Sequence, residues 1–262
     1  MADVAPDRRA AFTAERADML AFCGGLDPVE WRMDSRAQGW RIQDVLAHMG
    51  TGCRAPFSLG AVKFMRGNDI ENANDLMVDT RRDWPVSQVL AEYRRWSGVV
   101  AVVFPLVGGS PLGRVRMPLA ELGRFPVQLL SSAMVFDHHT HLRHDMAPAL
   151  GRPAPGTDAN RMSVVLEWMM AVLSNQMRTA APAWLDRPLA ITLTGPGGGT
   201  WRVAPDGSVT PGSPNGSVAQ ITGVACEFPE WGTQRVGWRD RDVRISGDAD
   251  YAEVFLDTVN VV

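Results

Sequence analysis

Cysteine is scarce in this sequence, and the few cysteines are far apart. The chain has three, Cys23, Cys53 and Cys226, an odd number without any CxxC pair. Such a pattern supports neither a disulfide framework nor a cysteine-based zinc knuckle. Free cysteines are usually buried, so we expect all three to act as small hydrophobic residues in the core.

Lysine is nearly absent, and the chain carries no excess of positive charge. Lys63 is the only lysine, the arginines are dispersed along the chain, and the formal net charge is -3. A nucleic-acid-binding protein usually presents a basic patch or stripe to the phosphate backbone. The sequence gives no electrostatic reason to expect a nucleic-acid partner.

Long hydrophobic runs are absent as well. No apolar segment approaches the ~20 residues that span a bilayer, and the charged N-terminal stretch is not followed by the apolar segment of a signal peptide. We therefore expect a soluble, cytoplasmic protein that does not enter the membrane. With 262 residues, the chain is long enough for one large domain or two modest ones.

The first half of the sequence is predicted to be helical. Apolar residues recur with the period of an amphipathic helix over residues 8–24, 40–53 and 85–106. A further helix is expected through Phe57 to Met65, followed by a break at residues 67–69, whereas residues 72–82 give no clear pattern. A loop with Pro118 and Gly123 leads into a helix that carries most of the histidines. Because no segment here is typical of a strand, the first domain is most simply a four-helix bundle.

The second half is predicted to be a small α+β domain. The proline- and glycine-rich stretch 151–156 marks the boundary, so the domains are residues 1–153 and 154–262. A long apolar helix over about 162–180 precedes segments with the two-residue period and β-branched content of strands. Those strands are predicted at 189–194, 199–203 and 242–247, before a short helix at 250–259. Glycines 195–199 lie between two strands and indicate a hairpin turn, not a phosphate loop.

Four of the five histidines lie in the ten residues from 136 to 145, together with two aspartates. In a regular helix Asp137, His141 and His144 project from one face, because positions i, i+4 and i+7 line up. His48 lies beside the apolar stripe of another helix. A carboxylate and two imidazoles suit a divalent transition metal, with a position left for water or substrate.

We expect His48, Asp137 and His141 to be the metal ligands. His144 is held in reserve, as an alternate ligand or a group that supports one. His138 and His139 point elsewhere on the helix and are expected to be structural or exposed. Arg143 is on the same helix but off the ligand face, so a salt bridge is its expected use.

Several motifs carry a resemblance to a known family. The sequence resembles the mycothiol-dependent maleylpyruvate isomerase family, which combines a DinB-like metal-binding four-helix bundle with a sterol-carrier-like C-terminal α+β domain. The residues that carry the resemblance are Gly39 to His48, Phe136-Asp137-x3-His141, Asp145-x4-Leu150-Gly151-Arg152-Pro153, Leu193 to Val203, and Gly247-Asp248.

The resemblance implies a Zn²⁺ ion, or another divalent transition metal, bound by His48, Asp137 and His141. Two departures stand out. Asp137 takes the place of a glutamate in the isomerase, and Asp145 follows His141 by four residues where many relatives have three. Both departures bear on whether maleylpyruvate is the substrate.

The resemblance also implies mycothiol as a co-substrate. A thiol coordinated to zinc is held as the thiolate, which is a nucleophile at neutral pH. Attack on a small electrophilic, possibly carboxylated, substrate would give isomerisation or S-transfer. In the family an arginine of the C-terminal domain is implicated in activity, and Arg235 is the matching candidate here.

Two other functions stay open at the level of sequence. The chain could be a non-catalytic small-molecule or lipid-binding protein, with the ligand in its C-terminal domain. The same helical bundle could also hold a metal that activates water for hydrolysis. An open metal position favours either enzyme, whereas a fourth protein ligand favours the binding protein.

Overall fold

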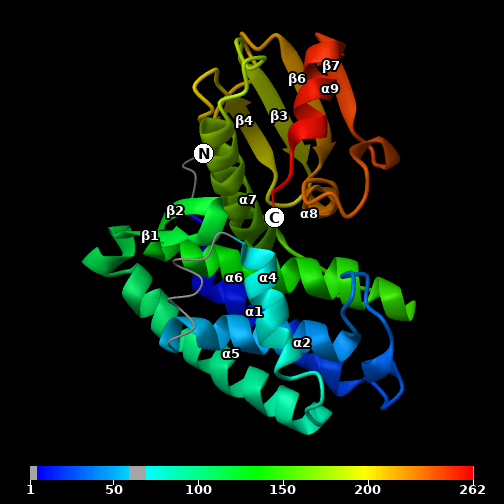
Figure 1. Ribbon diagram of the computed structural model, residues 1–262. Coiled ribbons are helices and arrows are strands. Elements are labelled where there is room, and N and C mark those ends of the chain that lie inside the picture. Colours follow the sequence, from blue (N-terminus) through cyan, green and yellow to red (C-terminus); the bar gives the residue numbers. More distant parts are fainter. Residues whose placement is uncertain (1–4, 59–68, 262) are drawn as a thin grey trace. The chain divides into compact units, whose positions relative to one another are not determined.

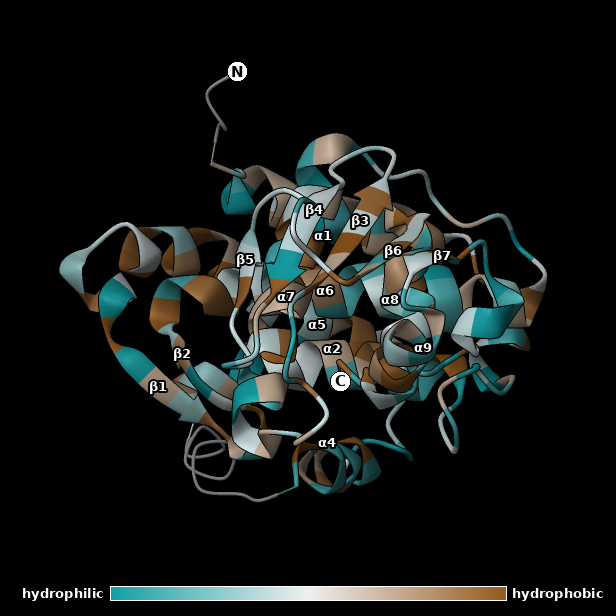
Figure 2. Ribbon diagram, turned by 90° about the horizontal axis from the view of Figure 1, so that it is seen from above, coloured by the Kyte–Doolittle hydropathy of each residue, from teal (hydrophilic) through white to brown (hydrophobic). Residues whose placement is uncertain are grey.

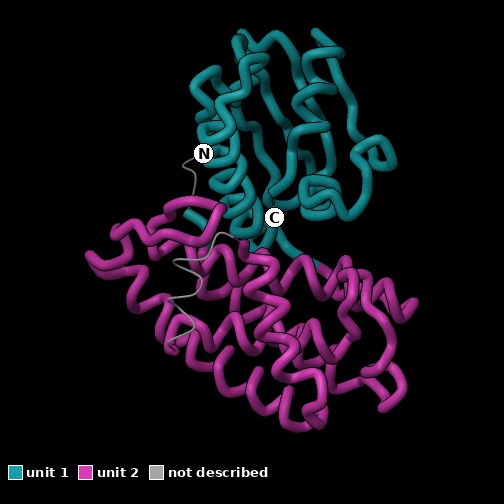
Figure 3. Tube along the Cα trace, in the orientation of Figure 1, with its two compact units in different colours: residues 1–6, 157–262 teal, residues 7–156 magenta. Residues whose placement is uncertain are grey.

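A computed structural model describes residues 5–58 and 69–261. The described residues form two compact units, 7–156 and 157–261, the second of which also includes residues 5 and 6 (Figure 3). The first is mainly helical and the second is α+β, which confirms the predicted fold class. The helix expected through Met65 and the break at Gly67 fall largely outside the described residues.

The described residues of the helical unit form four helices that pack against one another and a shorter fifth (Figure 1). The four are α1 (Arg8–Gly24), α2 (Ile42–Arg54), α5 (Val86–Gly108) and α6 (Leu130–Thr140). The last of these continues directly into a π-helical segment, His141–Met146. The shorter helix, α4 (Ile70–Asp79), packs against α2 and occupies part of the segment that had no clear pattern.

The predicted apolar stripe of α2 faces the core of this unit. Ile42, Val45, Leu46 and Met49 are at most 1% exposed. They belong to one cluster with residues of α5 and of the π-helical segment, including Tyr93. Burying such a stripe removes several apolar side chains from water, at roughly 1.5–3 kcal/mol each. Most of α2 is buried, and this stripe is the part of it that joins the core cluster.

The loop predicted around Pro118 and Gly123 is instead a short antiparallel hairpin. Its strands are β1 (Arg116–Leu119) and β2 (Gly123–Pro126). Proline and glycine are depleted in strands, so four-residue strands containing them give almost no sequence signal. The hairpin gains cross-strand hydrogen bonds from two arginines: Arg116 donates to the carbonyl of Arg124, and Arg124 donates to that of Arg116. The prediction that this unit has no strand is therefore wrong.

The α+β unit is built on a five-stranded sheet. The strands are β3 (Leu189–Thr194), β4 (Gly199–Val203), β5 (Val209–Pro211), β6 (Ala219–Val224) and β7 (Arg244–Gly247), in the order β5-β4-β3-β6-β7. Only the β3–β6 pair is parallel; the other pairs are antiparallel. The hairpin predicted between the first two strands is confirmed, with Leu193 opposite Gly199.

Three helices complete the α+β unit. They are α7 (Ala159–Ala180), the short α8 (Phe228–Trp231) and α9 (Ala249–Thr258). Helices α7 and α9 lie on the same side of the sheet (Figures 1 and 2). Along β6, buried and half-buried residues alternate, as expected for a strand with one covered face. Among the described helices of both units, none is long and apolar enough to cross a membrane.

Candidate metal centre

Three side chains from two helices converge in the helical unit. Nε2 of His48 in α2 lies 3.3 Å from Oδ2 of Asp137 in α6. Nε2 of His141, one turn further along, lies 3.5 Å from Oδ1 of the same carboxylate. One ligand atom from each of the three residues lies within 4.8 Å of the others. The fold thus brings the three predicted ligands together across 89 residues of sequence.

His141 is oriented by a second carboxylate. Its other ring nitrogen, Nδ1, lies 2.7 Å from Oδ2 of Asp145, which is buried. A histidine that ligates a metal commonly has such a carboxylate on its second nitrogen, which leaves Nε2 for the metal. The four-residue spacing from His141 to Asp145 falls inside the π-helical segment, where the amide of Ala147 donates to the carbonyl of Leu142.

The group is electrostatically suited to a cation. Burial raises the pKa of Asp137, but the effect of His48 and His141, which lower it, is larger in sum. The pKa of Asp137 therefore lies well below its ordinary value. Asp137 is therefore ionised at neutral pH and available as a ligand.

The residues fit a divalent metal. Two imidazoles and a carboxylate are a donor set found in catalytic zinc sites. Ligand atoms about 2.0–2.1 Å from a tetrahedral zinc stand about 3.3 Å apart, close to the 3.4 and 3.5 Å between Oδ1 of Asp137 and the Nε2 atoms of His48 and His141. Both histidines direct Nε2 toward Asp137, so both would bind a metal through Nε2.

The reserve ligand His144 is not part of this group among the described residues. The prediction that it shares a face with Asp137 assumes a regular 3.6-residue period. The π-helical segment from His141 to Met146 breaks that period, because each turn contains an extra fraction of a residue. The ring of His144 lies 6.3 Å from that of His139 instead.

His138 and His139 are structural and not exposed, since both are 1% exposed. Nδ1 of His138 lies 2.8 Å from the carbonyl oxygen of Met134, and its ring packs against Phe12 and Tyr93. Burial lowers the pKa of His138 to about 4, although the nearby Asp137 raises it in part. His138 is therefore neutral at neutral pH.

Arg143 forms the predicted salt bridge. Its guanidinium contacts Glu15 at 2.5 Å and Asp18 at 3.1 Å, both in α1. It also donates to the carbonyls of Pro155 and Gly156 at the end of the helical unit. The sequence pointed to a salt bridge but not to these partners, because they lie more than 120 residues away.

Arg235 lies in the α+β unit, in the segment that follows α8. It is half-buried, and its Nη1 donates to Oγ1 of Thr233 at 3.0 Å. Its backbone amide donates to the carbonyl of Glu230. Its role in catalysis stays a prediction.

The cysteines differ in burial. Cys23 and Cys53 are buried as predicted, and burial raises the pKa of Cys23 to about 12. Cys226 is exposed, so the prediction is wrong for this residue. It lies in the turn between β6 and α8, where the neighbouring Ala225 and Phe228 face the core.

Trp40 is a neighbour of the group that the sequence did not single out. Its ring centroid lies 4.9 Å from that of His48 and 6.1 Å from that of His141. The motif from Gly39 to His48 contains this residue, but a spacing of eight residues along the chain gives no indication of ring contact.

Fold and site together define a class: a helical unit with a two-histidine, one-carboxylate group, joined to an α+β unit. Residues 12–100 match the family model described as the Mycothiol maleylpyruvate isomerase N-terminal domain. Two solved structures match at 13% identity, each covering 91% of this chain and 91% of their own. They are the mycothiol-dependent maleylpyruvate isomerase, with a TM-score of 0.58, and a histidine-to-alanine mutant, with 0.57.

No curated protein matches the chain. At such low identity the structural likeness establishes the fold, while the family model covers the helical segments that include His48. Residues 12–100 thus match the N-terminal domain of the family that the sequence motifs predict, and the two solved structures share the fold of the whole chain. The likeness of the C-terminal unit to a sterol-carrier domain stays a prediction.

Proposed function

We propose that this protein is a zinc-dependent enzyme that uses mycothiol to isomerise a small electrophilic substrate or transfer sulfur to it. The convergence of His48, Asp137 and His141 carries the proposal, and His48 lies in the segment that matches the family model. The cytoplasmic location expected from the sequence stays a prediction.

Each residue of the group has a separate task. Asp137 supplies negative charge, since its pKa is held well below the ordinary value by the two histidines. His141 presents Nε2 because Asp145 occupies its Nδ1. His48, on α2, supplies the second imidazole nitrogen of the group. When bound, the metal would keep a coordinated thiol deprotonated at neutral pH.

Metal analysis tests the ligand set. We expect the purified protein to contain about one zinc per chain, and both His48→Ala and His141→Ala to lose it. His144→Ala is expected to keep its zinc, because this residue lies outside the group. Equal zinc in the wild type, His48→Ala and His141→Ala would show that the proposed ligands are wrong.

A thermal-shift titration tests the co-substrate. Mycothiol should raise the melting temperature of the zinc-loaded protein, since a ligand that binds only the folded state stabilises it. Glutathione serves as a thiol control and a fatty acid as a probe of the binding-protein alternative. A shift with the fatty acid alone would contradict the enzyme proposal. Assay of maleylpyruvate isomerisation with mycothiol then tests the substrate.

Arg235 is proposed to anchor a carboxylate of the substrate or of the thiol. Its support is the half-buried position beside Thr233 and the family resemblance of its segment. Arg235→Met should lower kcat/KM about 10- to 100-fold, the effect of losing a charged hydrogen bond. Arg244→Met, at an exposed arginine of β7, is the matched control and should leave kcat/KM unchanged.

A further inference from the structure

The two histidines of the metal group are held in different ways. Nδ1 of His141 meets Asp145 at 2.7 Å. Nδ1 of His48 is buried and has neither a hydrogen-bond partner nor a carboxylate contact among the described residues. A ligating histidine usually needs a contact at its second nitrogen to fix the orientation of the ring. For His48, another kind of contact must take over this task.

The indole of Trp40 makes that contact. Its ring lies 4.9 Å from the ring of His48, tilted by 45°, and 6.1 Å from that of His141, nearly parallel at 24°. The two imidazoles are 5.1 Å apart. Trp40 is 9% exposed and lies two residues before α2. Aromatic pairs at such distances prefer specific relative geometries, so this packing restricts the rotation of both imidazoles.

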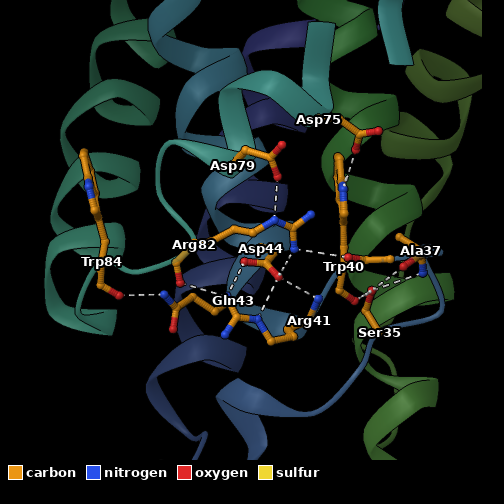
Figure 4. Close-up of polar contacts among 11 residues, drawn as sticks. Ser35, Ala37, Trp40, Arg41, Gln43, Asp44, Asp75, Asp79, Arg82 and Trp84 are labelled. Carbon is orange, nitrogen blue, oxygen red and sulfur yellow. Dashed lines mark hydrogen bonds and ion pairs between the residues drawn. The ribbon is translucent and has the colours of Figure 1, made fainter. Parts of the chain in front are cut away.

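Trp40 is held by hydrogen bonds at its indole and at its backbone carbonyl (Figure 4). Its Nε1 donates a hydrogen bond of 2.8 Å to Oδ1 of Asp75 in α4. Its carbonyl accepts from the hydroxyl of Ser35 at 2.7 Å and from the amide of the same residue at 2.9 Å. The indole therefore cannot turn away from His48 without breaking a hydrogen bond to α4.

A second contact joins α4 to the start of α2. Arg82 lies 2.6 Å from Asp79 in α4 and 3.2 Å from the buried Asp44 of α2 (Figure 4). Arg41, at the N-cap of α2, also binds Asp44 through its backbone amide and side chain. Asp75 is thus carried on a helix whose position relative to α2 is set independently of Trp40.

We propose that Trp40, held by Asp75, is a positioning residue that keeps Nε2 of His48 directed at Asp137 and so sets the metal affinity of the group. This inference rests on the metal site of the proposed function. Trp40 acts through His48 and ligates nothing itself. The effect should be graded: loss of the ring matters most, and loss of the Trp40–Asp75 hydrogen bond matters less.

Titration of Co²⁺ into the chelator-treated full-length protein, followed by visible absorption, measures this affinity. Trp40→Leu should weaken Co²⁺ binding about 10- to 100-fold, as for other residues that orient a ligand. Asp75→Ala removes the hydrogen bond and keeps the indole, whereas Trp40→Phe removes the hydrogen bond and keeps a smaller aromatic ring; both should weaken binding about 2- to 10-fold. Trp31→Leu is the matched control, because Trp31 is 4% exposed in the same core cluster; its Co²⁺ affinity should equal that of the wild type.

The outcomes separate the two proposals. If the wild type binds no Co²⁺ or Zn²⁺, the proposed metal site is wrong, and the proposed role of Trp40 is wrong as well. If the wild type binds and Trp40→Leu binds equally tightly, the metal site stands and the positioning role is overturned.

A spectroscopic measurement covers the case in which Trp40→Leu does not fold. ¹⁵N NMR of the imidazoles in the zinc-loaded protein reports each ring separately. In Asp75→Ala we expect the His48 nitrogens to shift while those of His139 stay in place. Unchanged His48 signals together with unchanged Co²⁺ affinity in Asp75→Ala and Trp40→Phe would also overturn the inference.

Discussion

The two units differ in what they bury. Among the described residues, those that are polar or charged and buried lie in the helical unit, with Thr233 as the exception. The core of the α+β unit is otherwise apolar, as along β3 and α7. Burying a polar group costs free energy unless it is hydrogen-bonded or paired. The helical unit bears that cost at its ligand group and in buried ion pairs such as Arg143–Glu15, whereas the core of the α+β unit is mainly apolar.

Ion pairs show the same contrast. In the helical unit Arg143 is 7% exposed and binds Glu15, which is fully buried. In the α+β unit Arg239 binds Glu253 and Asp257, and all three side chains are about half exposed. A buried pair is strongly destabilising to break, while an exposed pair contributes little.

The largest effect is expected from breaking the buried pair. Arg143→Met should lower the free energy of unfolding of the helical unit by about 3–5 kcal/mol, because it leaves the Glu15 carboxylate buried without its partner. Urea unfolding measures this loss. Combining Arg143→Met with Glu15→Gln should restore part of the stability. Arg239→Met is the control in the other unit, and an equal loss there would contradict the contrast between the units.

Acid should destabilise the helical unit before the α+β unit. The pKa of His138 is lowered to about 4 in the folded protein, from 6.5 ordinarily. The unfolded chain therefore takes up the proton first. The stability is present above pH 6.5 and is lost as the pH falls toward 4, by about 3 kcal/mol in total.

Unfolding measured from pH 8 to pH 4 tests this sign and range. His138→Leu should remove this part of the pH dependence. All five histidines precede residue 157, so the α+β unit has no histidine and serves as the internal control. The same loss of stability in both units between pH 6.5 and 5 would contradict the assignment to His138.

A smaller effect is expected at the carboxylate behind His141. Asp145→Asn should weaken zinc binding about 10- to 100-fold, because it removes the charge that orients the imidazole through Nδ1. Competition with a chelating dye measures the affinity. Asp248→Asn, at the N-cap of α9 in the α+β unit, should not change it. Unaltered zinc affinity in Asp145→Asn would show that the contact at 2.7 Å does not orient the ligand.

The smallest effect concerns the cysteines. Of the three, we expect only Cys226 to react with an aromatic disulfide reagent in the native protein, because Cys23 and Cys53 are buried. Burial and the nearby Glu227 raise the pKa of Cys226, so the reaction should accelerate at higher pH. Cys226→Ser should abolish the reaction without altering stability. Rapid labelling of three thiols in the native state would contradict the burial of the other two.

Sequence reasoning was strongest for long amphipathic segments. The bounds of α1 and β3 agree with the predicted ranges, and those of α5 nearly do, because a sustained apolar period reports which face is buried. It was weakest for strands that pair with distant segments. The inner strand β6 was not predicted, and its partner β3 lies about thirty positions earlier, joined by parallel pairing. Local pattern carries no information about such a partner.

The same division runs through the candidate site. Residue type and helical spacing were enough to select His48, Asp137 and His141, since imidazole and carboxylate chemistry is a property of the side chains themselves. Only the tertiary structure showed that His144 does not belong to the group, because a π-helical turn changes the direction of every later side chain. It also decided that Trp40 packs on His48 and is bound by Asp75, 35 residues away. Such contacts depend on distances between helices, and no local sequence pattern encodes those distances.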